Sequence, residues 1–326
     1  MPAAEIIKPK ITIKVVGVGG GGNNIVRCVR EKYDLDITLI GINSDLRQLN
    51  TLHKQGIAVL PIGENLTNGR GTGGRVEIGE QAAREGEKAI RAILEGADLV
   101  IIAATMGGGF GTGAAPVVAE IARDMGILSI GVVTMPFHFE MARKIQTAQA
   151  GIAQMQGYTD AFITMRNDNL LKIAPDRNLS FVDAFSLADE VLRQTVGCVA
   201  ELILTTGIIN VDFSDVTTIF RQSPSSDALL AIGVDETPQK AVRKAIESPL
   251  IDRDVTGARG VVLNLTGDPA MSLRDVDEAV HYIHKTAHPE VNVIVGLVVQ
   301  EKMAGSVQAT LIATDFDDSY VPASQG

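Results

Sequence analysis

The sequence Gly-Gly-Gly-Phe-Gly-Thr-Gly occupies residues 107–113, between an apolar run and a helix-like segment. The run before it, 98–106 (DLVIIAATM), is typical of a buried strand, and 114–126 (AAPVVAEIARDMG) has the apolar spacing of a helix. Glycine lets a backbone approach a ligand closely, and the first N–H groups of a helix are free to bind an anion. Residues 107–113 therefore predict a phosphate-binding loop.

A second glycine run, GVGGGGNN at residues 17–24, joins another predicted strand (11–18) to another predicted helix (23–33). Two such loops at neighbouring strand ends would surround a polyphosphate from two sides. The pattern G-x-x-x-x-G-K-[ST] does not occur, so the phosphate charge has to be met by backbone dipoles and a cation such as Mg²⁺. A tight strand-to-helix turn without a ligand is the alternative for this run.

The first run also fits a dinucleotide-binding fingerprint. Gly17, Gly19 and Gly22 satisfy G-x-G-x-x-G, and Asp45 ends the second predicted strand roughly 20 residues later. An NAD-dependent oxidoreductase is therefore an alternative. A dinucleotide fold has no need of the second, denser glycine run, however, and the five histidines are scattered in settings that do not suggest acid–base catalysis.

Strands alternate with helices over the first half of the chain. Further strands are predicted at 37–44, 128–137 and 160–167, and a long helix at 76–96. This alternation predicts an α/β fold with a parallel, doubly wound sheet. Residues 180–207 form a long apolar-periodic segment with Ser180 as its N-cap, and such a helix would be a spine between two domains.

The pattern after about residue 215 predicts a second, smaller α/β domain with a mixed sheet. Helices are expected at 237–248 and 273–287, and strands at 257–267, 291–300 and 306–316. The chain is therefore divided into an N-terminal tail (1–10), a nucleotide-binding domain (11–178), a central helix (179–207), a C-terminal domain (208–316) and a flexible tail (317–326).

Composition excludes several classes of protein. The net charge of −10 argues against a general nucleic-acid binder and against docking on anionic lipid. Cys28 and Cys198 lie in apolar helical patterns, so we expect small core residues and no disulfide or protein metal site. The N-terminus lacks a signal-peptide pattern, and no apolar run reaches the length of a membrane span. A cytoplasmic protein without membrane insertion is predicted.

The motif GGGFGTG is similar to the tubulin signature GGG-T-G-[ST]-G, and its surroundings resemble the FtsZ family of prokaryotic tubulin homologues. Further similar segments follow in the family's order, including KVVGVGGGGNNIV, GVVTMPFHFE, RNDNLLKI, DAFSLADEVL and IINVDFSDV. The resemblance implies a Rossmann-like GTPase domain, a long central helix and a smaller C-terminal domain. It also implies GTP and GDP as ligands, with Mg²⁺ held mainly through the phosphates, and head-to-tail self-assembly, typically in cell division.

The resemblance assigns nucleotide-binding residues by position. They comprise the two glycine loops, a loop that senses the γ-phosphate, a ribose contact, a phosphate-side cation, a nucleoside amide, an aromatic on the base and an acid on the guanine edge. An acid suits guanine because N1–H and N2–H₂ both donate. The glycine loops contribute Gly20, Gly21, Gly22, Asn23, Asn24, Gly107, Gly108, Gly109, Phe110, Gly111 and Thr112. The loop that senses the γ-phosphate contributes Thr72 and Gly73, the ribose contact is Glu140, and the phosphate-side cations are Arg143 and Lys144. The nucleoside amide is Asn167, the aromatic on the base is Phe185, and the acid on the guanine edge is Glu190.

The segment NVDFSD after the central helix carries Asn210, Asp212 and Asp215. Two carboxylates three residues apart could simply begin a helix or bind a cation. The resemblance instead implies that this loop enters the nucleotide pocket of the next subunit. There the two aspartates would orient or polarise the attacking water and the asparagine would contact the nucleotide, so hydrolysis would require polymerisation.

The sequence departs from the family pattern at Phe110, which stands where the signature has threonine. We predict a large ring beside the phosphates, lower turnover, and faster hydrolysis in the variant Phe110→Thr. The chain also stops soon after its last predicted strand, whereas division proteins of this family continue into a peptide that binds membrane adaptors. The alternative function is therefore a nucleotide-binding filament with weak turnover and a role outside division.

Overall fold

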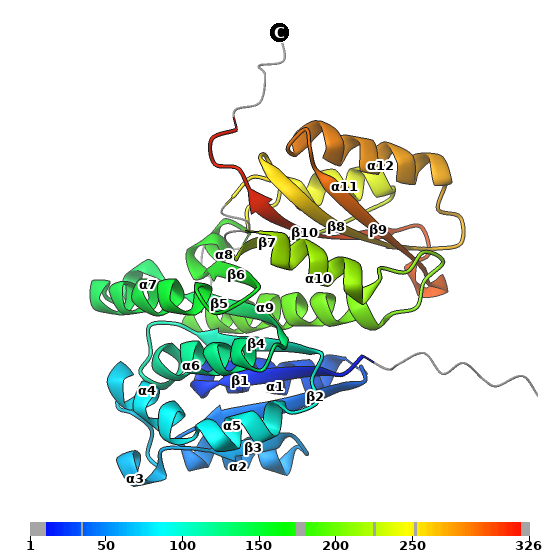
Figure 1. Cartoon of the computed structure of the whole chain (residues 1–326). Helices are drawn as coiled ribbons and strands as arrows, with labels where there is room; N and C mark the ends of the chain where they lie inside the picture. The colour runs from blue at the N-terminus through cyan, green and yellow to red at the C-terminus, as the bar shows by residue number, and fades with distance from the viewer. Residues whose placement is uncertain (1–10, 34, 174–179, 224–225, 251–252, 321–326) are drawn as a thin grey trace, which may run out of the picture.

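The computed structural model describes residues 11–33, 35–173, 180–223, 226–250 and 253–320. Within these residues ten strands form one sheet in the order β3-β2-β1-β4-β5-β6-β7-β10-β8-β9 (Figure 1). The first six strands are all parallel, in the order of a Rossmann fold. They are β1 (Ile13–Val18), β2 (Ile37–Asn43), β3 (Ala58–Pro61), β4 (Leu99–Thr105), β5 (Leu128–Met135) and β6 (Ala161–Arg166).

Helices cover both faces of the parallel strands. One face packs against α4 (Val76–Glu85), α5 (Glu87–Leu94), α6 (Phe110–Asp124) and α7 (Ala142–Gln156). The other packs against α1 (Gly19–Lys32), α2 (Leu46–Lys54) and α9 (Phe181–Leu204). Strands buried on both faces need apolar side chains at every position, which explains the unbroken run of buried residues in β4. The predicted doubly wound sheet is confirmed.

The predicted helices differ from the observed ones in three places. The single helix predicted at 76–96 is wrong, because α4 ends at Glu85 and α5 begins after Gly86, which packs against Ile62. The helices predicted from 23 and from 114 both begin earlier, at Gly19 and Phe110, so part of each glycine run is helical. Five further helices and strands of this half were not predicted: α2, β3, α3 (Glu64–Thr67), α7 and α8 (Asn167–Ile173).

The central helix α9 joins the two halves of the molecule. Ser180 is its N-cap, as predicted, and accepts a hydrogen bond from the Asp183 backbone at 3.1 Å. The helix has 24 residues and a length of about 36 Å. It ends at Leu204, three residues before the predicted end, because Gly207 lies in the loop and donates its N–H to Asn210 Oδ1.

The C-terminal half is a mixed sheet, as predicted. Strand β10 (Val307–Phe316) is antiparallel to both β7 (Asp227–Asp235) and β8 (Ala258–Gly267), while β9 (Asn292–Val299) is parallel to β8. Helices α11 (Pro238–Ile246) and α12 (Leu273–Thr286) cover its outer face, and α10 (Phe213–Gln222) covers the inner face beside α9 (Figure 1). Only two residue pairs join β6 to β7, so the sheet is narrowest between the halves.

The end of the chain is more ordered than predicted. Asp317, the first residue of the predicted flexible tail, accepts a hydrogen bond from Arg259 at 2.7 Å, and the Tyr320 ring lies 4.9 Å from the His288 ring. The flexible tail therefore does not begin at residue 317. The predicted tail 1–10 and residues 321–326 lie outside the described residues.

Phe220 tests the contact that α10 makes with the sheet. Its side chain is 1% exposed and belongs to the core that also contains Val262 and Ile312. We expect Phe220→Ala to lower the free energy of unfolding by about 3–5 kcal/mol, because the cavity removes packing on both sides. Urea denaturation measures this loss, and Val234→Ala, at a side chain that is 42% exposed, is the control. A loss below 1 kcal/mol in Phe220→Ala would contradict the packing described.

Candidate functional site

A pocket opens where the carboxyl ends of β1, β4 and β5 meet the start of α9. Both glycine runs contribute to it, and so do the loop after β5 and the beginning of α8. The lining residues are Gly21, Asn24, Thr105, Met106, Gly107, Gly108, Thr134, Pro136, Glu140, Lys144, Asn167, Phe185, Ala188, Asp189 and Leu192.

The glycine loops bring the N-termini of α1 and α6 together at this pocket. A Cβ atom at Gly19 would lie 2.8 Å from the Gly111 nitrogen, and one at Gly109 would lie 2.3 Å from Thr72 Oγ1. Neither helix has a side-chain hydrogen bond at its N-cap. Thr112 fixes the second loop by accepting the Gly107 N–H at 2.9 Å. Two uncapped helix N-termini facing one pocket form a site for an anion.

Two buried asparagines carry side-chain atoms without a hydrogen-bond partner among the described residues. Asn167 is 6% exposed and lines the pocket, and its Oδ1 atom is unpaired. Asn23 is 3% exposed, and neither amide atom is paired, but its side chain lies behind the pocket against Gly41. A buried amide without a partner is costly, so Asn167 in particular is an acceptor awaiting a ligand. Asn24 is exposed and lines the pocket directly.

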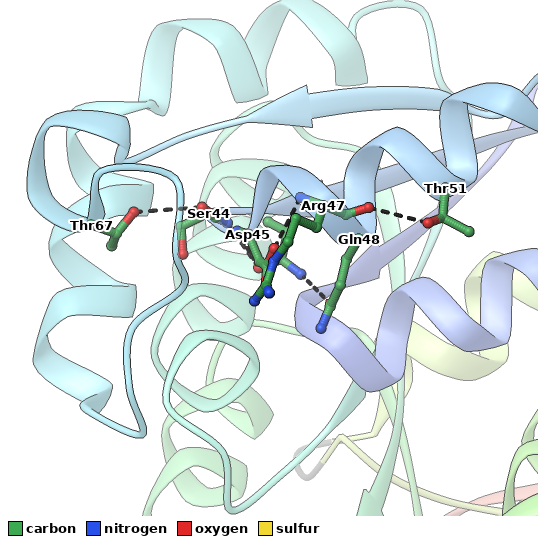
Figure 2. A network of polar contacts seen from close by, with 7 residues as sticks. Ser44, Asp45, Arg47, Gln48, Thr51 and Thr67 are labelled. Atoms are coloured by element: carbon green, nitrogen blue, oxygen red, sulfur yellow. Dashed lines mark hydrogen bonds and ion pairs between the residues drawn. The ribbon is translucent and has the colours of Figure 1, made fainter.

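The residue that a dinucleotide fold would use for ribose has another role here. Figure 2 shows Asp45 at the end of β2, where its carboxylate accepts the Arg47 N–H at 3.0 Å and caps α2. The neighbouring Gln48 accepts a hydrogen bond from Asn43 at 2.8 Å and lies beside Gly20. The polar groups at the end of β2 therefore hold the start of α2.

The loop between β5 and α7 supplies one acid and one cation to the pocket. Glu140 accepts the Phe137 N–H at 3.0 Å and pairs with Lys144 at 3.1 Å. Both side chains line the pocket, whereas Arg143 is exposed and does not. Among the described residues that line the pocket, Lys144 carries the positive charge. Its ammonium group would offset part of the negative charge of a bound phosphate.

Helix α9 presents one face to the pocket through Phe185, Ala188, Asp189 and Leu192. The predicted acid, Glu190, does not line the pocket, because it lies on the next face and pairs with Arg193 at 2.8 Å. That hydrogen bond lowers the pKa of Glu190, whereas burial raises the pKa of Asp189. The assignment of Glu190 is therefore corrected to Asp189. The signal was in the sequence, since the fourth residue after Phe185 shares its face and the fifth does not.

The predicted catalytic residues lie beyond the other end of α9. Asn210 Oδ1 accepts the Gly207 N–H at 2.6 Å, and Asp212 caps α10 by accepting the Ser214 N–H at 3.2 Å. Asp212 and Asp215 are both exposed. The stretch of α9 from Asp189 to its last residue alone spans about 22 Å, so these carboxylates cannot reach the pocket of their own chain.

Comparison with known proteins assigns the two halves of the chain. The model of the Tubulin/FtsZ family GTPase domain matches residues 12–175, and that of the FtsZ family C-terminal domain matches residues 227–317. The structure of an empty FtsZ dimer from M. jannaschii matches at 35% identity over 94% of this chain and 88% of that chain, with a TM-score of 0.85. The chain belongs to the tubulin/FtsZ family.

Other solved structures of this family agree in fold. A point mutant of M. jannaschii FtsZ matches at 34% identity over 97% of this chain and 95% of that chain, with a TM-score of 0.87. CetZ2 from Haloferax volcanii, in a protofilament with GTPγS bound, matches at 18% identity over 95% of this chain and 94% of that chain, with a TM-score of 0.80. The predicted family and fold are confirmed, and the N-terminal half is a GTPase domain.

None of the helices that the structure describes has the length and apolar character needed to cross a membrane. The described residues also contain no group of three or more His, Cys, Asp or Glu side chains placed to hold a metal ion.

The side chain of Phe110, which stands where the FtsZ-like signature has threonine, is buried. The Phe110 side chain is 6% exposed and belongs to the core cluster that also contains Val18, Ala83 and Met106, so its ring is covered by the protein rather than open to the pocket. The residue is the first of α6, and its ring points into the interior rather than into the pocket. Thr72 is buried against Gly109, and Gly73 is exposed beside it.

The position of Phe110 reverses the expected effect of Phe110→Thr. We now expect this variant to lower the free energy of unfolding by about 3 kcal/mol, because it leaves a cavity and places a hydroxyl in the core. Thermal and urea denaturation measure the loss, and Phe110→Leu, which keeps an apolar side chain, is the milder control. Faster turnover in Phe110→Thr without loss of stability would show that the ring lies against the nucleotide after all.

Proposed function

We propose that this protein binds GTP and hydrolyses it between neighbouring subunits of a head-to-tail filament that acts in cell division. The observation that carries the proposal is the division of the site. The phosphate-binding pocket lies at the start of α9, and the exposed pair Asp212 and Asp215 lies beyond its end. One chain cannot bring these groups together, whereas stacked copies can.

The pocket suits a guanine nucleotide in charge and in polarity. The two glycine loops would receive the phosphates, Lys144 would offset part of their charge, and Glu140 would contact the ribose. Phe185 would pack on the base, and Asp189 would accept hydrogen bonds from guanine N1–H and N2–H₂. The unpaired Asn167 Oδ1 gains a partner when the nucleoside binds. Mg²⁺ would be held mainly through the phosphates, and the loop of Thr72 and Gly73 would lie near the γ-phosphate.

The acidic loop suits a role in hydrolysis on the neighbouring subunit. Phosphoryl transfer depends chiefly on positioning the nucleophile and on managing charge. Capping of α10 fixes Asp212, and the bond to Gly207 fixes Asn210, so the loop is already ordered in one chain. The carboxylates of Asp212 and Asp215 would orient the attacking water, and Asn210 would contact the nucleotide.

Apolar side chains are exposed at both ends of α9, as head-to-tail contact requires. Val182 and Phe185 are exposed near its start, and Ile208 and Ile209 just beyond its end. Exposed apolar side chains gathered at one place mark interaction surfaces. The related structures include an FtsZ dimer and a CetZ2 protofilament, which supports self-association as the mode of assembly.

The alternative function, a filament with weak GTP turnover, was based mainly on a Phe110 ring beside the phosphates. The burial of this ring in the core weakens that argument. Assembly and turnover are tested together by light scattering and phosphate release with GTP, GDP and ATP. We expect GTP alone to drive assembly and phosphate release to begin with it. Failure of GTP to bind or to drive assembly overturns the proposal, and filaments without phosphate release favour the structural filament. Division-site adaptor proteins remain expected partners of a filament that turns over.

The choice between Asp189 and Glu190 gives a sharp test of guanine recognition. We expect Asp189→Asn to weaken GTP binding by about 10- to 100-fold and to narrow the preference over ATP, because an amide offers guanine a donor where it needs an acceptor. Glu190→Gln, one residue away and outside the pocket, should bind GTP as the unmodified protein does. Titration with a fluorescent GTP analogue measures both. Equal effects of the two substitutions would contradict the proposed base contact.

Asp212→Asn tests the shared site. Asparagine caps a helix as well as aspartate does, so we expect intact folding and GTP binding but a loss of phosphate release of about 100-fold. Asp254→Asn is the matched control, since exposed Asp254 accepts the Thr256 N–H at 3.2 Å in the same local geometry. Mixing Asp212→Asn with Asp189→Asn subunits should restore turnover, because intact pockets then meet intact loops. No restoration in mixed filaments would place both groups in one subunit's site.

A further inference from the structure

Met141 has a backbone conformation that side chains other than glycine rarely adopt. Its φ is 85° and its ψ is 134°, at the junction between the loop after β5 and helix α7. Asn68 and Asp315 also have positive φ among the described residues, but short polar side chains tolerate that region far better than methionine. Such a conformation costs about 1–3 kcal/mol and persists only where the surrounding structure imposes it.

The loop around Met141 is held on both sides. Phe137 and Glu140 exchange two hydrogen bonds of 3.0 Å, one between backbones and one from the Phe137 N–H to the Glu140 carboxylate. His138 donates its N–H to Asp168 at 3.0 Å, and Lys144 donates its N–H to the Met141 carbonyl at 3.0 Å. These contacts fix the chain before and after Met141, so its backbone has no freedom to relax.

Within the part of the chain that the structure describes, the Met141 side chain itself does little to offset this strain. The Met141 side chain is 71% exposed, so it neither packs in the core nor lines the pocket. Glycine at this position would remove the strain and the exposed apolar surface together. The strained backbone and the exposed apolar side chain of Met141 both destabilise the single subunit. A residue with two such costs indicates that its side chain makes a favourable contact in a complex.

Met141 lies beside an exposed aromatic side chain and next to the nucleotide pocket. Phe139 beside it is 52% exposed and stacks on Phe137, whose ring in turn meets Phe185 at 5.4 Å. Met141 also lies between Glu140 and Lys144, which both line the nucleotide pocket. Any surface that closes over this pocket therefore meets the Met141 side chain.

We propose that Met141 and Phe139 form an apolar contact with the opposite end of the next subunit, and that the strained backbone directs Met141 toward it. This inference rests on the proposed head-to-tail assembly. The opposite end exposes Ile208 and Ile209 next to the acidic loop, at 71% and 46%, so the loop that would enter the pocket brings apolar partners with it. Methionine adapts its shape to such a contact, which suits an interface that forms and dissociates.

Three substitutions of Met141 separate the strain from the contact. Met141→Gly removes both, Met141→Ala keeps the strained Cβ but removes the contact, and Met141→Leu keeps both. We expect the melting temperature to rise by about 2 °C or more in the glycine variant only. The critical concentration for GTP-driven assembly should rise about tenfold in the glycine and alanine variants and stay within about twofold in the leucine variant.

Binding of a fluorescent GTP analogue should be the same in all three variants, since the side chain does not line the pocket. Assembly of Met141→Ala and Met141→Gly at the unmodified critical concentration would overturn the contact, and a lower melting temperature for Met141→Gly would overturn the strain. If the unmodified protein itself fails to assemble with GTP, the proposed function fails first and this contact with it. If it assembles and all three variants match it, only the contact fails.

Discussion

The close approach of two helix N-termini is the constraint on which the rest of the structure depends. β1 and β4 are paired with Gly17 opposite Ala103, so the helices that follow them begin at the same edge of the sheet. Gly19 and Gly111 bring the first turns of α1 and α6 to a distance that a Cβ atom would prevent. The positive ends of two helix dipoles then face each other, and an anion between them relieves their repulsion. The polyphosphate of a nucleotide meets this requirement, which is why the glycine runs imply a ligand as well as a turn.

The length of α9 separates the pocket from the acidic loop. Its first turns carry the pocket-lining residues Phe185 and Asp189, and its last turn leads into the loop of Asp212. A helix of this length is rigid on the scale of the site, so the pocket and the acidic loop stay apart whatever the nucleotide does.

The sequence predicted the structure best where a residue pattern is compatible with only one kind of local structure. Strands buried on both faces and glycine-rich strand ends predicted the parallel sheet and the pocket edge, and Ser180 predicted the start of α9. The errors concern rotation about a helix axis. Asp189 lies about 40° from Phe185 around the helix and Glu190 about 140°, so one position decides between pocket and surface. Phe110 was misplaced for a related reason, since α6 begins inside the glycine run and turns that side chain into the core. The break falls at Gly86, a poor helix former that the predicted single helix ran through, where a Cβ atom would lie 2.7 Å from Ile62 Cγ2.

Several features that destabilise the single subunit lie near the nucleotide pocket, at the end of the molecule where α9 begins. The helix N-termini are uncapped, Asn167 Oδ1 has no partner among the described residues, Met141 is strained and Phe139 is exposed. In the proposed filament the nucleotide would bind the helix N-termini and Asn167, and the neighbouring subunit would cover Met141 and Phe139. The loop from Phe137 to Lys144 carries Phe139 and Met141 together with the pocket residues Glu140 and Lys144, so ordering this loop for one ligand would also order it for the other. In the proposed filament, binding of nucleotide and binding of the neighbour would therefore strengthen each other, and by linkage the effect would be equal in both directions. Hydrolysis would remove the γ-phosphate from the point where the two meet, and so would weaken the contact on which hydrolysis depends.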